Sequence, residues 1–329
     1  MNQALEATAS AIAVVIPCYR SGELVLDVIR RIGPEVGWIF VVDDCCPILT
    51  GQTVLAGCPD PRVTVLFHSE NQGVGGAVIT GYNAAMKTEA LVAVKIDGDG
   101  QMAPELIPQL CHSILSGQAD YVKGNRFHLA GRVADMPLLR LVGNVGLSFM
   151  TKASSGYWQL FDPTNGYTAI HTRVLAELDT DKIARRYFFE SDMLFRLNLL
   201  RAVVSEMPMR AIYEGEPSSL SPMKVPLPFL KGNIRNFFKR IFYRYFVSDF
   251  SLASLELVAA IPLLAFGIIY GAEHLLANRA SGETASAGIV MASALPIIVG
   301  FQLLLSWLGY DVSTQPTRAL HGQLPPLRR

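Results

Sequence analysis

Residues 91–101 read Leu-Val-Ala-Val-Lys-Ile-Asp-Gly-Asp-Gly-Gln, an apolar run that ends in two carboxylates separated by a glycine. A short, continuous apolar run bounded by turn residues is typical of a strand buried on both faces. We predict four such strands, at Ile12–Pro17, Trp38–Asp43, Val63–His68 and Leu91–Asp97. Helical patterns accompany them near Glu23–Ile32, Val74–Lys87 and Pro104–Leu115. This alternation predicts an α/β fold with a mainly parallel sheet and right-handed crossovers.

Polar residues gather where the predicted strands end. Ligands of doubly wound sheets bind beyond the carboxyl ends of the strands. Those ends carry Pro17-Cys18-Tyr19-Arg20, Asp43-Asp44, His68-Ser69-Glu70-Asn71 and Asp97-Gly98-Asp99. The sequence therefore predicts a site at this edge of the sheet.

Asp97 and Asp99 are the candidate metal ligands. Hard divalent cations prefer oxygen ligands, and Mg²⁺ binds through one or two carboxylates together with substrate phosphates. Such a cation would neutralise the charge that develops on a departing nucleoside diphosphate. An Asp-x-Asp sequence can also be a bare surface turn. Its place after a buried strand, with the acidic pair Asp43-Asp44 at another strand end, favours the metal site.

Four motifs occur in the order and spacing of glycosyltransferase family 2, namely Ile16-Pro17-Cys18-Tyr19, Val41-Val42-Asp43-Asp44, Asn71–Ala77 and Asp97–Gln101. The chain resembles the polyprenyl-phosphate branch of that family, which includes dolichyl-phosphate mannose synthases and bacterial polyprenyl-phosphate hexosyltransferases. The similarity covers about Ile12–Ala202. It implies a Rossmann-like GT-A nucleotide-sugar domain and inverting transfer of a hexose from a UDP- or GDP-sugar to a polyprenyl phosphate.

The resemblance also implies residue roles on the donor side. The nucleotide-sugar site would comprise Pro17, Tyr19, Asp43, Asp44, Asp97, Asp162 and Thr164. In it Pro17, Tyr19 and Asp44 line the base and ribose pocket, Asp43 supports the loop, and Asp162 and Thr164 shape the sugar pocket. Mg²⁺ or Mn²⁺ would be held by Asp97, Asp99 and Gln101. Ordinary packing for Tyr19 and turn or capping roles for the other polar residues are the structural alternatives.

On the acceptor side, a lipid phosphate is already anionic and needs cationic positioning more than a base. Arg126 and Arg140 match arginines that serve the acceptor phosphate in the mannose synthases, and Arg132 is a third candidate without a firm counterpart. Surface salt bridges are the structural alternative for all three. Thr168 stands where those enzymes usually have a basic residue, which leaves the sugar and the acceptor class open.

Asp99, Glu190 and Asp192 are the candidate catalytic residues. With a hydroxyl acceptor, as in a lipid-linked saccharide, Glu190 or Asp192 would be the general base. With a phosphate acceptor, either would bind sugar hydroxyls or orient an arginine. Structural ion pairs with Arg185, Arg186 or Arg196 are also possible. Glu190 occupies a position that is often Gln in the mannose synthases.

The character of the chain changes after about residue 215. Pro217, Pro222, Pro226 and Pro228 predict a linker, and a basic, aromatic amphipathic helix suited to a membrane surface follows within residues 216–248. Phe250–Ala272 and Ala287–Tyr310 are apolar over more than the ~20 residues needed to cross a bilayer. We therefore expect a catalytic domain in residues 1–215, a two-helix transmembrane hairpin in 249–311 and a tail in 312–329.

Composition and charge set the expected location. Basic residues flank the hairpin, while Arg279 alone lies in its loop, so both ends should face the cytoplasm. We expect a two-span protein of the inner or plasma membrane with a cytoplasmic catalytic domain. The five cysteines, uneven and odd in number, suit a reducing compartment. The net charge of zero gives no reason to expect nucleic-acid binding. The expected partners are a nucleotide sugar, a polyprenyl phosphate and the bilayer, with a possible homo-oligomer; a non-enzymatic scaffold is disfavoured.

Overall fold

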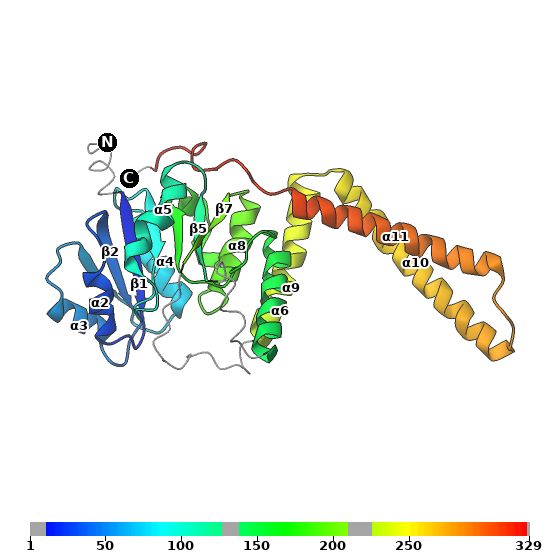
Figure 1. Cartoon of the computed structure of the whole chain (residues 1–329), viewed down its shortest axis with the longest axis horizontal. Helices are drawn as coiled ribbons and strands as arrows, with labels where there is room; N and C mark the ends of the chain where they lie inside the picture. Colours follow the sequence, from blue (N-terminus) through cyan, green and yellow to red (C-terminus); the bar gives the residue numbers. More distant parts are fainter. Residues whose placement is uncertain (1–10, 127–137, 210–225, 328–329) are drawn as a thin grey trace. The chain divides into compact units, whose positions relative to one another are not determined.

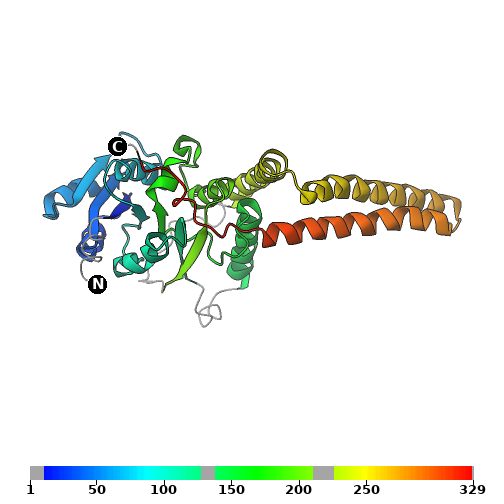
Figure 2. The same cartoon turned by 90° about the horizontal axis from the view of Figure 1, so that it is seen from above.

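The computed structural model describes residues 11–126, 138–209 and 226–327. It divides into two compact units (Figures 1 and 2). Unit 1 consists of Met1–Phe237 together with Pro316–Arg329, and unit 2 of Phe238–Gln315.

Unit 1 contains a seven-stranded sheet in its described part. The strands are β1 (Ile12–Cys18), β2 (Val36–Asp43), β3 (Val63–Phe67), β4 (Val92–Lys95), β5 (Tyr121–Asn125), β6 (Thr168–His171) and β7 (Val204–Pro208). Their order is β3-β2-β1-β4-β6-β5-β7. All neighbours run parallel except β6, which is antiparallel to β4 and to β5. The predicted mainly parallel α/β fold is confirmed, although the sequence reading named no strand beyond Asp97.

Helices cover both faces of this sheet. They are α2 (Leu24–Arg30), α3 (Thr50–Gly57), α4 (Val74–Ala85), η1 (Pro104–Leu106), α5 (Ile107–Leu115), α6 (Leu138–Ser155), α7 (Thr172–Ala176), η3 (Thr180–Lys182) and α8 (Phe189–Leu199). Val14 and Ile16 pack with α2 and α5, whereas Ala13 and Val15 pack with α4 and α8. Because successive side chains of a strand point to opposite faces, burial on both sides requires the unbroken apolar run seen in the sequence.

The C-terminal segment returns to unit 1, where it lies along the domain (red in Figure 2). The fully buried Asp120 carboxylate, just before β5, accepts hydrogen bonds from Leu320 N (2.8 Å), His321 N (2.9 Å) and His321 Nδ1 (2.7 Å). The His321 ring stacks on His171 at 4.2 Å between centroids, and Leu320 packs against the α4–α8 core. Burial lowers the pKa of His171 to about 4, so this stacked ring is neutral at pH 7. Residues 312–329 were predicted to be a tail; in the structure Pro316–Arg329 belongs to unit 1.

The structure corrects the predicted start of the amphipathic helix. The prolines were expected to keep residues up to Pro228 in a linker, but α9 spans Pro226–Phe242 and is followed by a π-helical turn at Tyr243–Ser248. Proline is tolerated in the first turn because the amide hydrogen that it lacks has no partner within the helix there. Pro226 and Pro228 therefore begin the helix.

Unit 2 is dominated by two long helices, α10 (Leu252–Ser281) and α11 (Ala287–Ser313). Both are long and apolar enough to cross a membrane, and only 28% and 6% of their most apolar windows are buried. A core helix of a soluble protein would be mostly buried, so the exposed apolar surface fits the predicted hairpin. Near its base the buried Arg240 guanidinium forms a bidentate pair with Asp311 (2.6 and 3.0 Å), and Tyr245 Oη donates to the same carboxylate (2.7 Å).

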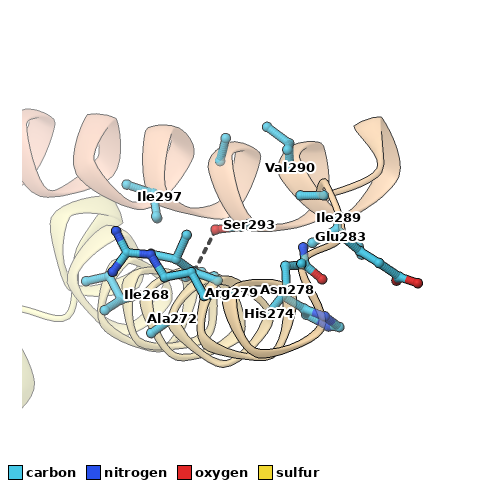
Figure 3. Close-up of a pocket in the computed structure, with 16 residues that line it drawn as sticks. Ile268, Ala272, His274, Asn278, Arg279, Glu283, Ile289, Val290, Ser293 and Ile297 are labelled. Atoms are coloured by element: carbon cyan, nitrogen blue, oxygen red, sulfur yellow. Dashed lines mark hydrogen bonds between the residues drawn. The ribbon is translucent and has the colours of Figure 1, made fainter.

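Small residues let α10 and α11 approach one another. A Cβ on Gly267 would lie 2.7 Å from the Ser293 carbonyl oxygen, and Ser293 Oγ donates to the Gly267 carbonyl at 2.9 Å. Figure 3 shows this hydrogen bond in the groove between the helices, with Asn278, Arg279 and Glu283 near the loop. The glycines of α10 thus serve packing within one hairpin, and the homo-oligomer stays a prediction.

We predict that Asp120→Ala releases the C-terminal segment. The Leu320 and His321 amides lose their buried acceptor, which should cost about 1–3 kcal/mol for the unsatisfied groups. Hydrogen–deuterium exchange of the peptide that contains residues 318–324 should become at least about tenfold faster. Asp179→Ala, which removes an exposed ion pair with Lys182, is the control and should leave this peptide protected. Unchanged exchange in Asp120→Ala would contradict the docking.

Candidate active site

The centre of the site is a buried ammonium at the carboxyl end of β4. Lys95 Nζ lies 2.9 Å from Asp97 Oδ1 and 3.3 Å from Glu190 Oε1, and the Lys95 side chain is only 2% exposed. Burial alone would lower the pKa of Lys95, but the two carboxylates outweigh this and raise it. The lysine is therefore a cation, and it joins the β4 end to the first turn of α8.

Thr168 separates two buried lysines in the sheet. Strand register places Lys95 opposite Thr168 and Thr168 opposite Lys123, so all three residues lie in one row on the face covered by α4 and α8. Lys123 is fully buried and donates to the Asn165 carbonyl at 2.7 Å. Burial lowers the pKa of Lys123 to about 8. Thr168 is thus a small residue between the ammonium groups of Lys95 and Lys123. A third basic side chain at this position would add charge repulsion.

Asp97 and Asp99 lie together beyond β4, as the sequence predicts. Burial, and to a lesser extent the charge of Asp97, raise the pKa of Asp99. Asp99 Oδ1 accepts the Gln101 amide at 3.0 Å, which closes the turn. No cluster of three His, Cys, Asp or Glu side chains that could hold a metal occurs among the described residues. Two neighbouring carboxylates fit a divalent cation whose remaining ligands come from a diphosphate and water.

The Asp43-Asp44 pair is buried and holds loops. Asp43 accepts the Cys46 amide at 2.7 Å and the Gly51 amide at 2.6 Å, so it ties the loop after β2 to the start of α3. Asp44 accepts the amides of Gln72 and Gly73, both at 2.8 Å, and a 2.7 Å contact from His68 Nδ1. Its predicted contact with the nucleotide stays a prediction, because in this geometry both carboxylate oxygens already have protein partners.

Glycines at the start of α4 lie against another loop: Gly73 is the N-cap, and Gly75 and Gly76 are in the first turn. Gly73 has a φ of +86°, and Gly76 N donates to the Arg185 carbonyl at 3.0 Å. A Cβ on Gly75 would lie 2.5 Å from the Ala184 carbonyl oxygen. These glycines therefore allow residues 184–186 to approach the start of α4, a use that the sequence reading did not anticipate.

Pro17 and Tyr19 lie at the end of β1. Pro17 is opposite Val42 in the sheet, and the Tyr19 side chain is 48% exposed with the Arg20 guanidinium 5.5 Å from its ring centroid. An exposed ring beside the strand ends is more consistent with ligand contact than with core packing. The role in base binding remains a prediction.

Arg126 and Asp162 form one group. Arg126 Nε and Nη2 lie 2.7 and 3.0 Å from the fully buried Asp162 carboxylate, so the guanidinium is fixed by two parallel hydrogen bonds. Glu206 supports this arrangement by accepting the Asp162 amide at 2.8 Å. Thr164 is half-buried in the same loop. Of the other two predicted phosphate-binding arginines, Arg140 belongs to α6 and Arg132 lies outside the described residues.

Asp192 differs from Glu190. It is fully buried on α8, and its carboxylate accepts hydrogen bonds from Ala184 N (2.9 Å), Arg196 Nε (3.1 Å) and Asn236 Nδ2 (2.8 Å). These contacts join α8 to the loop before it and to α9. The geometry favours a structural role for Asp192, whereas Glu190 contacts Lys95 at the end of β4.

Lys95, Lys123 and Glu206 are the site residues that the sequence reading missed. Lys95 carried a usable signal, because a lysine inside a strand buried on both faces needs a carboxylate partner. Lys123 and Glu206 lie on strands that the reading did not identify. Their partners come from segments distant in the sequence, so no local sequence pattern indicates that Lys123 and Glu206 belong to the site.

Residues 13–179, just over half of the chain, match glycosyl transferase family 2. A UDP-N-acetylglucosamine–dolichyl-phosphate N-acetylglucosaminyltransferase of Methanococcus voltae is 36% identical over 46% of this chain and 60% of its own length. An undecaprenyl-phosphate mannosyltransferase of Micrococcus luteus is 32% identical over 60% of this chain and 82% of its own length. The matched region thus spans less than two thirds of the first relative and most of the second.

Among solved structures, glucosyl-3-phosphoglycerate synthase of Mycobacterium tuberculosis, in complex with Mn²⁺, UDP-glucose and phosphoglyceric acid, has a similar fold. The TM-score is 0.53, with 19% identity over 73% of this chain and 82% of that chain. Together the sheet, the acidic strand ends and these likenesses define a glycosyltransferase with the GT-A fold. The chain belongs to glycosyltransferase family 2, and its similarity to lipid-phosphate enzymes supports the predicted polyprenyl-phosphate branch.

We predict that Asp192→Ala lowers the free energy of unfolding of the catalytic unit by about 3 kcal/mol, because it removes one partner of a buried ion pair. Thermal unfolding followed by circular dichroism measures this effect. Asp27→Ala is the matched control: it removes an exposed pair with Arg30 and should cost less than about 0.5 kcal/mol. Equal stability of Asp192→Ala and the parent would contradict the structural role.

Proposed function

We propose that this protein transfers a hexose from a UDP- or GDP-linked sugar to a polyprenyl phosphate, with inversion at the anomeric carbon and with a divalent cation. The observation that carries the proposal is the pair of carboxylates at the end of β4, in a chain that also has two helices of membrane-spanning length. The printed activities of the relatives, N-acetylglucosaminyl and mannosyl transfer to dolichyl or undecaprenyl phosphate, support the acceptor class.

On the donor side, Asp97 and Asp99, with Gln101 beside them, would hold Mg²⁺ or Mn²⁺ against the diphosphate. The cation supplies charge neutralisation for the departing nucleoside diphosphate. Pro17 and Tyr19 border the nucleotide, and Asp162 with Thr164 borders the sugar. The solved relative with bound Mn²⁺ and UDP-glucose supports a cation in this kind of fold.

On the acceptor side, a phosphate oxygen of the lipid attacks the anomeric carbon while the bond from that carbon to the diphosphate breaks. Direct displacement inverts the anomeric centre. The attacking oxygen carries no proton to remove, so its main need is positioning by cations. Arg126, oriented by Asp162, is the described candidate, and Arg140 and Arg132 complete the proposed set.

A hydroxyl acceptor would need a general base. Glu190 is paired with Lys95, and the Asp192 carboxylate is engaged by Ala184, Arg196 and Asn236. Both carboxylates are already engaged by protein groups, which favours the phosphate acceptor.

The proposed topology follows from connectivity. Unit 1 contains both the residues before the hairpin and the segment after it, so the two ends of the hairpin should face the same side as the catalytic domain. The basic flanks support a cytoplasmic location for that side, with the hairpin in the inner or plasma membrane. Residues 1–215 would form the catalytic domain, 216–248 the linker and interfacial helix, 249–311 the hairpin and 312–329 the cytoplasmic tail.

We predict that Asp99→Ala lowers sugar transfer by at least about 100-fold, because charge on the leaving diphosphate is no longer stabilised. Glu89→Ala is the control: Glu89 is an exposed carboxylate before the amino end of β4, and its loss should leave transfer near the parent value. Transfer is measured with and without Mn²⁺. Full activity of Asp99→Ala in EDTA would remove the metal role.

We also predict that label from a radioactive UDP- or GDP-sugar moves into the organic phase when undecaprenyl phosphate is the acceptor. Undecaprenol, the same lipid without phosphate, is the matched control and should accept no label. Product formed equally well on undecaprenol would show a hydroxyl acceptor. Turnover with all label left in the aqueous phase would show a non-lipid acceptor.

A further inference from the structure

We infer that Lys95 is a positioning residue that fixes the Asp97 carboxylate, and that Glu190 acts by holding Lys95 rather than by taking a proton from the acceptor. This inference rests on the proposed use of a divalent cation at Asp97 and Asp99. Neither Lys95 nor its link between Glu190 and Asp97 follows from the motifs in the sequence.

The first observation is the geometry of the ammonium. Lys95 Nζ lies 2.9 Å from Asp97 Oδ1 and 3.3 Å from Glu190 Oε1, with the lysine 2% and Glu190 13% exposed. Asp97 is 31% exposed. One buried cation thus reaches from the covered carboxylate of α8 to the accessible carboxylate at the strand end. The buried Lys95–Glu190 pair is charge-balanced. Asp97, which also contacts Lys95, is the carboxylate that faces outward.

The second observation is the lack of space around this contact. A Cβ on Gly166 would lie 2.4 Å from Lys95 Nζ and 3.1 Å from Asp97 Oδ2. Gly166 therefore lets the loop before β6 close over both groups. With Oδ1 directed at the ammonium and Oδ2 beside Gly166, the Asp97 carboxylate has a defined orientation before any ligand arrives.

The third observation is the close packing around Lys95. The lysine is on β4 opposite Thr168, and the side chains of Tyr82 and Tyr121 are fully buried on the same face. The Lys95 side chain is itself fully buried and therefore has few alternative rotamers. The Lys95 side chain therefore couples the position of the Glu190 carboxylate to that of the Asp97 carboxylate.

The electrostatics of the site agree with these roles of Lys95 and Glu190. Asp97 and Glu190 both contact the Lys95 ammonium, and Asp99 adds its charge beside Asp97, so these carboxylates would repel one another without a cation. Lys95 reduces this repulsion while leaving the outer carboxylates accessible. Residues that orient a metal ligand commonly change metal affinity by 10–100-fold when they are removed. A phosphate acceptor needs no base, so Glu190 is free for this positioning role.

The test must separate orientation from net charge. Lys95→Met/Glu190→Gln removes one positive and one negative charge, so the charge of the site is unchanged and the orienting contact is lost. Mn²⁺ binding by the full-length protein in detergent with UDP is followed by electron paramagnetic resonance of free Mn²⁺. We expect binding at least about tenfold weaker than in the parent. Lys182→Met/Asp179→Asn is the control: it also removes one positive and one negative charge, but from an exposed ion pair outside the site, and should bind Mn²⁺ as tightly as the parent.

A second variant covers the case in which the double variant does not fold. Gly166→Ala keeps both charges and drives a methyl group into Lys95 Nζ and Asp97, so it should also weaken Mn²⁺ binding at least about tenfold. Circular dichroism reports folding of each variant. Parent-like Mn²⁺ affinity in either folded variant would overturn the role of Lys95. A parent protein that binds no Mn²⁺ with UDP would overturn the proposed function as well, which distinguishes the two failures.

The role of Glu190 is tested by a conservative replacement. The Gln carbonyl in Glu190→Gln can still accept a hydrogen bond from Lys95, but an amide cannot act as a base. At saturating Mn²⁺ we expect Glu190→Gln to keep turnover within about tenfold of the parent, and Glu190→Ala to fall further. Loss of a general base costs about 10²–10⁴-fold. A Glu190→Gln variant as inactive as Glu190→Ala would assign the base role and overturn the inference for Glu190.

Discussion

One buried positive charge organises the catalytic edge of this protein. An ammonium enclosed by a sheet and helices is strongly unfavourable unless carboxylates compensate for it. Lys95 obtains that compensation from Asp97 and from Glu190, 95 residues later in the chain. The requirement fixes α8 over the end of β4 and demands a glycine at position 166. Breaking this contact would leave a charge unpaired and loosen the strand end where the proposed cation binds.

The carboxylates of the domain therefore divide by what they touch. Asp43, Asp44 and Asp192 are buried, and their oxygens accept backbone amides or side-chain donors that hold loops and helices. Asp97 and Asp99 lie beyond the strand end, where the pKa of Asp99 is raised by burial and by its neighbour. The three buried carboxylates hold the loops and helices around the site. Asp97 and Asp99 are the carboxylates that we propose bind the cation. Acidic residues that look equivalent in a sequence motif acquire these different roles only through packing.

The sequence was sufficient for features with a local signal. The four apolar runs predicted β1 to β4, and the length of the apolar segments predicted α10 and α11. Strands β5 to β7 were missed because they are short and some contain charged residues, among them Lys123 and Glu206, whose partners come from distant segments. The prolines at 226 and 228 were misread because helix breakers are harmless in a first turn. The ion pair of Lys95 was within reach, since a lysine in a buried strand implies a partner, but its identity was not.

The docking of the C-terminal segment affects how the protein is made. Synthesis proceeds from the amino terminus, so Leu320 and His321 leave the ribosome after both apolar helices have been translated. Asp120 and the ring of His171 are already present in the nascent domain, but their partners arrive last. The catalytic domain can therefore complete its packing only after the hairpin has been produced.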